Sequence, residues 1–331
     1  MKGLITIVSY NRLEALKKLL FCLSKLKIND LVIDLIVSID HSPSQNEIYT
    51  SISDFHWSHG QFNIIKEQSN LGLKKHVLRC GDRVSNYDYI VLLEEDIIIS
   101  PIFFDFAIPA IKLSQNDESI GGISLYTYIK NEDDKQAFHP LIDSYDNFYL
   151  QFPSSWGAIY TVEQWRDFVI WLNKNDCDSF NDPKVPDYVC LWPKQSWKKH
   201  MVRFLVNNNK YFLYPRFSLA SNPGIDGTHH HNIGSLYSVP ICLKRRCWQL
   251  SSPSESIAFY DVNFSPSNFE FLKSHYLFDG HISCGTNSRF DKADFILSSY
   301  FIGPSDLISI IRKFLVVFIR KLIFKLKGLF K

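Results

Sequence analysis

The acidic tripeptide Glu94-Glu95-Asp96 offers the clearest chemistry in the sequence. It follows the apolar run YIVLL at 89–93 and precedes Pro101 by a few residues. Three adjacent carboxylates at the end of a strand repel one another unless a cation lies beside them. A hard divalent ion, bound by carboxylate oxygens and by the phosphates of a substrate, would remove that repulsion. The tripeptide therefore indicates a metal and diphosphate site, and a solvated acidic turn is the simpler alternative.

The elements that would position this tripeptide alternate between strands and helices. Four apolar runs predict strands, at 4–8, 31–39, 62–65 and 87–93. Apolar residues at helical spacing predict helices over 13–26 and 71–84, and Pro101 marks the start of another. Buried strands that alternate with helices are typical of an α/β domain. We therefore expect a mixed, mostly parallel sheet flanked by helices.

Polar residues follow three of these predicted strands. They are Ser9 to Arg12, Asp40 to Ser42, and Glu94 to Asp96. Ligands of open α/β sheets bind beyond the carboxyl ends of the strands. We therefore expect these three segments to meet at one binding site.

The second half of the chain is less regular. An acidic, polar stretch at 126–147 predicts an excursion from the sheet, and 148–160 is expected to be extended. Helical spacing covers 162–172 and 194–206. The residues from 221 to 231 are rich in Asn, Gly, Asp and His, which is typical of a loop.

Composition narrows the classes of function. The 36 basic and 34 acidic residues give a formal charge of +2, which argues against a nucleic-acid-binding protein. The seven cysteines are scattered, with no CxxC pair. Together with the absence of a secretory signal pattern, this favours a cytoplasmic protein.

The C-terminal tail, residues 305–331, differs from the rest of the chain. It holds seven Lys or Arg residues against one Asp, and its longest apolar run is short. On a helical wheel five cations fall within an arc of about 100°. These are Arg312, Lys313, Arg320, Lys327 and Lys331. The tail is therefore predicted to be a basic amphipathic helix on an anionic membrane surface; a helix packed on the protein's own core is the alternative.

Several motifs occur in an order that resembles a known family. V-S-Y-N-R stands at 8–12, V-S-I-D at 37–40, and E-E-D at 94–96 is followed by S-P-x-F-F at 100–104. This layout resembles the GT-A fold glycosyltransferases. The similarity is greatest to the family 2-like group around eukaryotic N-acetylglucosaminyltransferase I and its bacterial relatives, over roughly residues 3–230.

The resemblance continues past the acidic tripeptide. Residues 152–157 with 161–165 resemble the family's F-P-x-x-G-W segment and the helix after it. Residues 192–197 resemble its W-P-K-x-x-W segment, and 214–218 its R-P-E-I-S segment. The implied organisation is a glycosyltransferase domain at 1–250, with a nucleotide-sugar half at 1–125 and an acceptor half at 126–250. An irregular extension at 251–304 and the membrane-associating tail at 305–331 would follow.

The resemblance also implies roles for individual residues. Asp96 would be the direct ligand of a divalent metal, Mn²⁺ or Mg²⁺. Glu94 and Glu95 would face the nucleotide ribose and the transferred sugar, and Asp40 would accept the uracil N3 hydrogen. The other residues implied in nucleotide binding are Ser9, Asn11, Arg12 and His76.

One departure concerns the catalytic base. The family carries Asp-Asp after the W-P-K-x-x-W segment, and one of these deprotonates the acceptor hydroxyl. This chain has Lys198 and Lys199 there, and an ammonium group is no base unless strongly desolvated. Asp187 is the substitute we predict, ahead of Glu163 and Asp182.

The run Thr228 to His231 suggests two further roles. By resemblance, His229 belongs to a loop that closes over the donor and contacts its phosphates. A solvent-exposed loop is an equal alternative, and adjacent histidines are a poor zinc site.

The sequence therefore predicts an inverting, metal-dependent bacterial glycosyltransferase that works at the inner face of the cell membrane. Its donor would be a UDP-sugar. Its acceptor would be a glycan or lipid-linked glycan, as in O-antigen or capsule polysaccharide synthesis. The alternatives are a nucleotidyltransferase that forms nucleotide-sugars and a catalytically silent binding protein of the same fold. The first would normally show a glycine-rich loop after the first strand, which VSYNR lacks.

Overall fold

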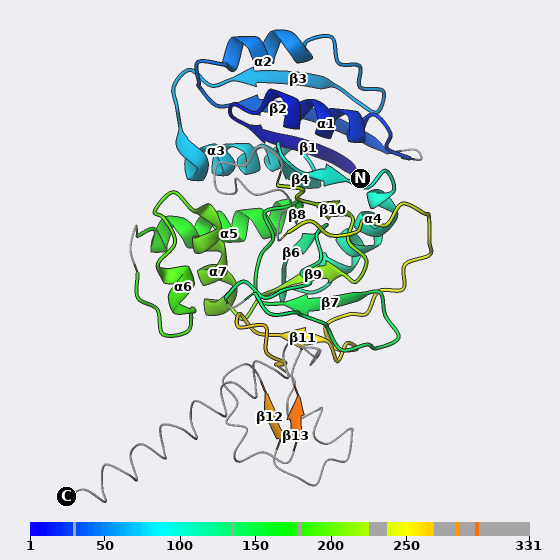
Figure 1. The fold of residues 1–331 in the computed structure, drawn as a ribbon, viewed down its shortest axis with the longest axis vertical. Coiled ribbons are helices and arrows are strands. Elements are labelled where there is room, and N and C mark those ends of the chain that lie inside the picture. Colours follow the sequence, from blue (N-terminus) through cyan, green and yellow to red (C-terminus); the bar gives the residue numbers. More distant parts are fainter. Residues whose placement is uncertain are drawn as a thin grey trace, which may run out of the picture.

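A single nine-stranded sheet organises the protein (Figure 1). The computed structural model describes residues 1–28, 31–133, 135–177, 180–224 and 237–267, and the short strands 282–284 and 295–297. In sheet order the strands are β11 (Phe259–Tyr260), β7 (Asn147–Leu150), β9 (Tyr211–Pro215), β6 (Ile120–Ser124), β8 (Ala158–Thr161), β4 (Tyr89–Glu94), β1 (Lys2–Ser9), β2 (Val32–Ile39) and β3 (Phe62–Lys66). Two small sheets pair β5 (Ile98–Ile99) with β10 (Ala220–Ser221), and β12 (Ile282–Cys284) with β13 (Phe295–Leu297).

Helices flank the sheet. They are α1 (Leu13–Leu23), α2 (Gln45–Ile52), α3 (Gly72–Gly81), α4 (Phe103–Ser114), α5 (Val162–Asn175), α6 (Asp187–Cys190) and α7 (Trp197–Asn207), with a 3₁₀ helix η1 (Asp82–Asn86) after α3. In α1 the buried side chains recur every three or four residues, which gives one apolar face toward the sheet. At the start of α5, Thr161 and Gln164 form a reciprocal capping box that satisfies two backbone N–H groups.

The strand order creates a switch point in the first half of the sheet. β1 pairs in parallel with β2 on one side and with β4 on the other. β3 extends the same parallel half beyond β2. The chain thus builds outward from β1 in one direction and then returns to add β4. Crevices for ligands form at such a reversal, outside the carboxyl ends of the strands.

The second half of the sheet is mixed. β8 runs antiparallel to both β4 and β6, and β7 runs antiparallel to β9, while β6 and β9 are parallel. Since one continuous sheet joins both halves, the second half is held rigidly beside the switch point.

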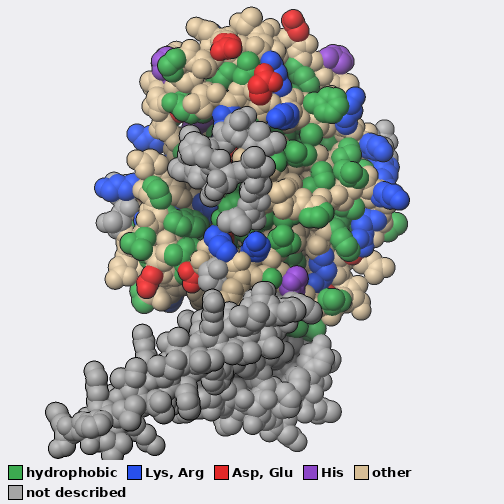
Figure 2. All heavy atoms as spheres, viewed as in Figure 1, with side chains coloured by type: hydrophobic (Ala, Val, Ile, Leu, Met, Phe, Trp, Pro, Cys, Tyr) green, Lys and Arg blue, Asp and Glu red, His purple; other side chains and the backbone are tan. Residues whose placement is uncertain are grey.

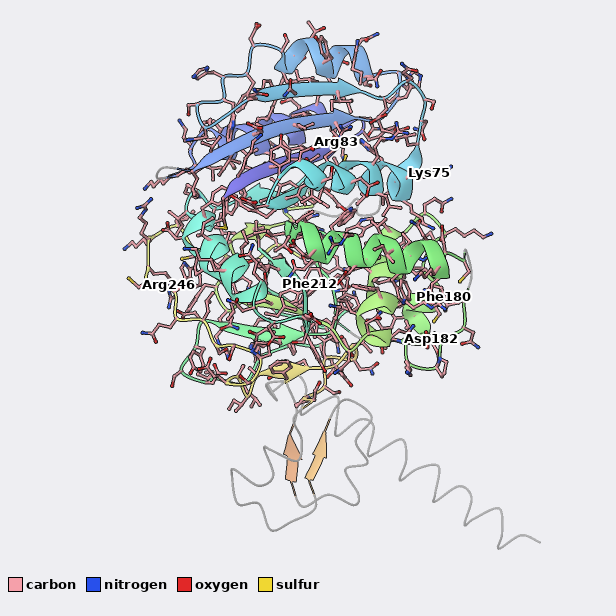
Figure 3. All side chains as sticks on the ribbon, turned by 180° about the vertical axis from the view of Figure 1, so that it is seen from behind. Lys75, Arg83, Phe180, Asp182, Phe212 and Arg246 are labelled. Carbon is pink, nitrogen blue, oxygen red and sulfur yellow. The ribbon has the colours of Figure 1, made fainter. Side chains whose placement is uncertain are left out.

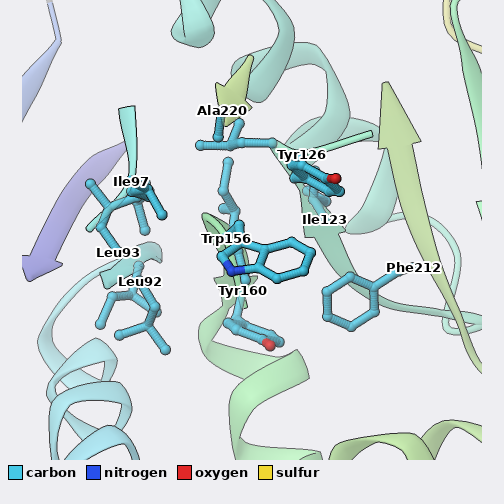
Figure 4. Close-up of a cluster of buried hydrophobic side chains, with 14 of the residues drawn as sticks. Leu92, Leu93, Ile97, Ile123, Tyr126, Trp156, Tyr160, Phe212 and Ala220 are labelled. Atoms are coloured by element: carbon cyan, nitrogen blue, oxygen red, sulfur yellow. The ribbon is translucent and has the colours of Figure 1, made fainter. Parts of the chain in front are cut away.

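Aromatic side chains fill the core next to β4, β6 and β8. Figure 4 shows Trp156 among Tyr126, Tyr160 and other buried side chains. The ring centroids of Tyr126 and Trp156 are 4.7 Å apart in an edge-to-face arrangement. Such rings bury large apolar areas and pack in defined geometries. The core therefore fixes the position of Trp156.

The predicted α/β class, with a mixed and mostly parallel sheet, is confirmed. Five of the eight strand pairings in the large sheet are parallel. The four predicted strands of the first half are β1, β2, β3 and β4. The sequence did not predict α2, β6 or β9.

The described structure covers only part of the division predicted for the second half of the chain. β11 pairs with β7, so residues just past 250 belong to the main sheet and the body extends beyond the predicted boundary. The tail at 305–331 lies outside the described residues. Among the residues that are described, no helix has the length and apolar character needed to cross a bilayer.

Candidate functional site

A cavity of about 530 Å³ lies at the switch point, beyond the carboxyl ends of β1 and β4. Seven of the predicted site residues line it: Ser9, Arg12, Asp40, His76, Glu94, Glu95 and Asp96. They come from three strand ends and from α3. The structure thus brings together the polar segments that the sequence placed at strand ends.

Arg12 and Glu95 form the floor of this cavity. Glu95 is buried, and its carboxylate accepts hydrogen bonds from Ser9 Oγ (2.5 Å), Tyr10 N (2.9 Å) and Arg12 Nε (2.9 Å). Arg12 Nη1 also bonds Asp96 Oδ2 at 2.6 Å. Burial alone would lower the pKa of Arg12, but the charges of Asp96 and Glu95 outweigh it and raise that pKa. A permanent cation therefore holds two of the three carboxylates.

These contacts separate the roles of the two glutamates. Because three donors of the β1 turn already occupy the carboxylate of Glu95, this side chain positions Ser9, Tyr10 and Arg12. Glu94 is half-buried, and within the described chain no donor bonds its carboxylate. Burial, then the charge of Asp96, raise the pKa of Glu94 to about 8, against the opposing charge of Arg12.

Asp96 fits a metal ligand. Its Oδ2 atom accepts from Arg12, while its Oδ1 atom is buried and has no hydrogen-bond partner. A buried carboxylate oxygen without a partner is costly unless water or a cation fills the position. Within the described ranges, no group of three or more His, Cys, Asp and Glu side chains could hold a metal alone. The residues present thus suit a cation that takes its other ligands from water and substrate phosphates.

Asp40 fixes a second wall of the cavity. It is 3% exposed, and its carboxylate accepts from the backbone N–H groups of His41 (2.8 Å), Leu71 (2.9 Å) and Gly72 (3.1 Å). Gly72 has a φ of 72°, a left-handed conformation that favours glycine, and it begins α3. Asp40 therefore ties α3 to the end of β2. A carboxylate offers about four acceptor positions, so it keeps capacity for a ligand donor.

His76 lies beneath this wall. Its Nε2 atom is 2.9 Å from Ser38 Oγ, and the side chain is 2% exposed. Burial lowers the pKa of His76, although the charge of Asp40 acts in the opposite direction. The imidazole of His76 is therefore neutral at pH 7, and it orders the cavity wall without adding charge.

Lys198 and Lys199, which stand where the resembled family carries aspartates, make separate contacts. Lys199 Nζ donates to the carbonyl oxygens of Cys190 (2.8 Å) and Trp192 (3.2 Å), which fixes the loop after α6. Lys198 Nζ donates to Tyr128 Oη at 2.8 Å and lies 4.7 Å from the ring centre of Phe152. Both side chains act as hydrogen-bond donors, and an ammonium group has no lone pair with which to accept a proton from a substrate.

Glu132 neutralises Lys198 below the cavity wall. Lys198 is 12% exposed and its Nζ atom is 3.5 Å from Glu132 Oε1, while Lys135 Nζ is 2.6 Å from Glu132 Oε2. Tyr237 Oη donates to the same Oε2 atom at 3.0 Å. Burial alone would raise the pKa of Glu132, but Lys198 and Lys135 outweigh it and lower that pKa. One carboxylate thus balances two cations behind Tyr237, which itself lines the cavity.

Other predicted residues do not join the cavity lining. Asn11 is exposed on the β1 turn, and Asp187 is exposed in the short helix α6. Glu163 is exposed in the first turn of α5. Asp182 accepts from Asn207 at 2.9 Å. His229 lies outside the described residues.

Sequence reasoning missed part of the lining. The additional polar or aromatic lining residues are Tyr10, Asn70, Trp156, Asn222 and Tyr237. Trp156 stands in a segment that the motif pattern marked, and its ring is 4.4 Å from that of Tyr237. The sequence feature that could have indicated Asn70 is Gly72, two residues later. The sequence around Asn222 and Tyr237 carries no motif that marks them as site residues, because only the folded sheet brings them to the cavity.

Comparisons with known proteins give only weak likenesses. No family model matches the chain, and no curated protein matches its sequence. S. aureus TarS 1–349 aligns with a TM-score of 0.39 and 13% identity, over 66% of this chain and 60% of that one. A complex of TarS 1–349 with UDP-GlcNAc gives 0.38 and 11%, over 77% and 61%. Mannosyltransferase PcManGT from Pyrobaculum calidifontis, in complex with GDP-Man and Mn²⁺, gives 0.44 and 12%, over 69% and 58%. The chain thus spans about 60% of the length of each.

The unpaired oxygen of Asp96 leads to a first prediction. We expect Mn²⁺ to increase the affinity of the unaltered protein for UDP, and Asp96→Ala should abolish that increase because it removes the predicted ligand of the ion. Calorimetric titration of UDP with and without Mn²⁺ measures this. Asp54→Ala, at an exposed aspartate, is the control and should keep the metal response. A metal response that survives in Asp96→Ala would exclude Asp96 as the ligand.

The buried Glu132 cluster leads to a second prediction. Glu132→Gln leaves Lys198 and Lys135 uncompensated and should lower the free energy of unfolding by roughly 3–5 kcal/mol. Because the pKa of Glu132 is lowered by folding, its contribution is complete above the ordinary carboxyl pKa and is lost as the pH falls through the folded value. The difference between variant and parent in urea unfolding should therefore be large at pH 7 and shrink below about pH 4.

A matched substitution separates this effect from a general loss of charge. Glu47→Gln, at an exposed glutamate of α2, should change the unfolding free energy by no more than about 0.5 kcal/mol. Equal effects of the two substitutions, or a Glu132→Gln effect that does not depend on pH, would contradict the assignment.

Proposed function

We propose that the protein is an inverting, metal-dependent glycosyltransferase that uses a UDP-sugar. The observation that carries this proposal is the unpaired, buried Oδ1 atom of Asp96 in a cavity at the switch point of the sheet. The cavity volume of about 530 Å³ is within the usual range for small-molecule sites. A nucleoside diphosphate that binds together with a divalent ion would complement the charge of Asp96 and fit its position in the cavity.

The cavity divides into three regions under this proposal. The uridine would lie beside Asp40, His76 and the turn before α3, where Asp40 accepts the uracil N3 hydrogen. The diphosphate would lie at Asp96, and the bound cation would neutralise the charge that develops on it. The sugar would lie toward Glu94 and Trp156, because an aromatic face suits the apolar face of a sugar ring.

The proposed reaction is a single displacement at the anomeric carbon. The acceptor oxygen forms a bond to that carbon while the bond to the UDP oxygen breaks, and the acceptor proton passes to a carboxylate base. Arg12 holds Asp96 and Glu95 in place throughout, so the site needs little reorganisation. Asp187 is our proposed base, and its exposed carboxylate in α6 is accessible to an acceptor from solvent.

The acceptor is proposed to be a glycan or lipid-linked glycan of the bacterial envelope. Support for a membrane-linked acceptor comes from the composition of residues 305–331, which combines seven cations with a long apolar face. We propose that this tail holds the enzyme peripherally on the inner face of the cell membrane. Production of O-antigen, capsule or a similar polysaccharide would be its role.

A catalytically silent binding protein is a second candidate. The specific observation in its favour is Lys198, which stands where the resembled family carries its base and is held by Tyr128 and Glu132. Release of UDP from UDP-sugars in the presence of envelope glycolipids and Mn²⁺ distinguishes the two functions. An enzyme releases UDP only when the acceptor is present.

The Asp40 wall leads to a third prediction, that the site prefers uracil to guanine nucleotides. The carboxylate of Asp40 accepts one hydrogen bond from uracil N3, and a purine places its own donor groups elsewhere. Competition calorimetry with UDP and GDP in the presence of Mn²⁺ should show UDP to be the tighter ligand by about tenfold or more. Equal affinities would refute the uracil-reading role of Asp40.

The base assignment leads to a fourth prediction. Asp187→Asn should leave the dissociation constant for UDP unchanged and lower turnover by roughly 10²-fold to 10⁴-fold, the usual weight of general-base catalysis. Glu163→Gln, at another exposed carboxylate, is the matched comparison. A near-normal rate for Asp187→Asn would remove it from the mechanism.

A further inference from the structure

A basic and apolar surface lies on one flank of the body. We call it the α1–loop patch and define it by the exposed residues Lys18, Phe21, Lys25, Lys27, Leu243 and Lys244. Figure 2 shows basic and hydrophobic side chains alternating down the right-hand side of the molecule, where α1 and α4 lie in Figure 1. Arg245 Nη2 donates to the carbonyl oxygen of Lys27 at 3.2 Å, so the loop and the end of α1 are neighbours.

Two large apolar side chains stand out from this patch. Phe21 is 63% exposed and Leu243 is 59% exposed. Lys25 Nζ lies 5.1 Å from the ring centre of Phe21, so a cation and an exposed ring share one position. Single exposed apolar residues need no explanation, but two of them among cations form a mixed surface. Such a mixture is typical of the boundary between lipid head groups and acyl chains.

The cations of the patch are available for an external anion. Within the part of the chain that the structure describes, no carboxylate lies within 4.0 Å of Lys18, Lys25, Lys27 or Lys244. The neighbouring acids are already engaged, since Glu14 pairs with Lys17 and Asp105 with Arg245. The patch thus carries uncompensated positive charge, unlike the cation pair around the buried Glu132.

The position of α1 relates the patch to the cavity. Arg12 lines the cavity, and α1 begins at the next residue and runs back along the sheet. Phe21 is nine residues further on, which places it roughly 14 Å along the helix axis. A surface bound at the patch would therefore leave Arg12 and the cavity uncovered.

We propose that the α1–loop patch docks the body of the protein on an anionic lipid bilayer, with Phe21 and Leu243 inserted among the head groups. Exposed apolar side chains among the cations match the head-group and acyl-chain boundary of an anionic bilayer, which offers negative charge and apolar groups together. This docking is independent of the tail at 305–331 and of the reaction catalysed. It would fix the orientation of the cavity relative to the membrane surface.

The test uses the full-length chain and vesicles of phosphatidylcholine with 30 mol% phosphatidylglycerol. The patch variant Lys25→Glu/Lys244→Glu should partition onto these vesicles roughly tenfold more weakly or worse, since each cation near such a surface contributes about fivefold. The matched control is Lys174→Glu/Lys184→Glu, which changes net charge equally at two exposed lysines. The two control lysines lie in the same region of the protein, because their sequence neighbours Asn175 and Asp182 both contact Arg203. Figure 3 shows Asp182 and Arg246 on opposite flanks.

Two further measurements make the result specific. Phe21→Ser/Leu243→Ser should weaken binding even at high salt, where charge is screened. Hydrogen exchange should slow on vesicles in peptides that contain 18–27 and 241–247. All variants should keep the parent's melting temperature and affinity for UDP, since none of these residues lines the cavity.

Three outcomes would overturn the proposal. Equal loss of binding in the patch and control variants would mean that net charge alone acts. Unchanged binding in the patch variant would leave the tail as the sole membrane contact. Stronger protection of 18–27 by poly-glutamate than by vesicles would assign the patch to an acidic protein. Loss of transfer activity with retained vesicle binding would affect the proposed function and leave this proposal standing.

Discussion

The interaction on which the site depends is the contact of Arg12 with Glu95 and Asp96. Parallel pairing of β1 with β4 brings the carboxylates of 94–96 against the turn that follows β1. Without a cation these groups would repel one another in a poorly solvated position. Arg12 neutralises the floor through Nε and Nη1, and Glu95 in turn fixes the backbone of that turn. Two carboxylates that line the cavity remain without a full set of donors: Glu94, whose pKa is raised to about 8, and Asp96, whose Oδ1 atom is unpaired.

A second charge cluster shows how the interior of the protein accommodates a buried lysine. Lys198 lies among aromatic rings, which interact favourably with a cation, and Glu132 supplies the counter-charge. Removing water around Lys198 lowers its pKa, while Glu132 and Glu94 oppose that change. The lysine is thus held as part of the wall behind Trp156. Any base for the proposed transfer must come from elsewhere in the chain.

Much of the first half could be predicted because β1, β2 and β4 are buried on both faces and its polar residues stand at strand ends. β6 was missed for a physical reason. Its sequence, IGGIS, contains two glycines, which are unfavourable in strands. The fold requires them, because a Cβ atom on Gly122 would lie 2.6 Å from the ring of Phe212. Packing between distant segments overrides local propensity there, and the same non-local packing brings Tyr237 to the cavity.

The helix that follows β1 links the cavity to the rest of the surface. α1 starts at the residue after Arg12, so the parallel topology that creates the switch point also directs this helix away from it. Its buried leucines hold it on the sheet, which leaves one face for Lys18, Phe21 and Lys25. A membrane bound to that face and a ligand bound at Arg12 would share one rigid element. The orientation of the cavity relative to a lipid surface would then be set by the fold itself, without a separate hinge or adaptor.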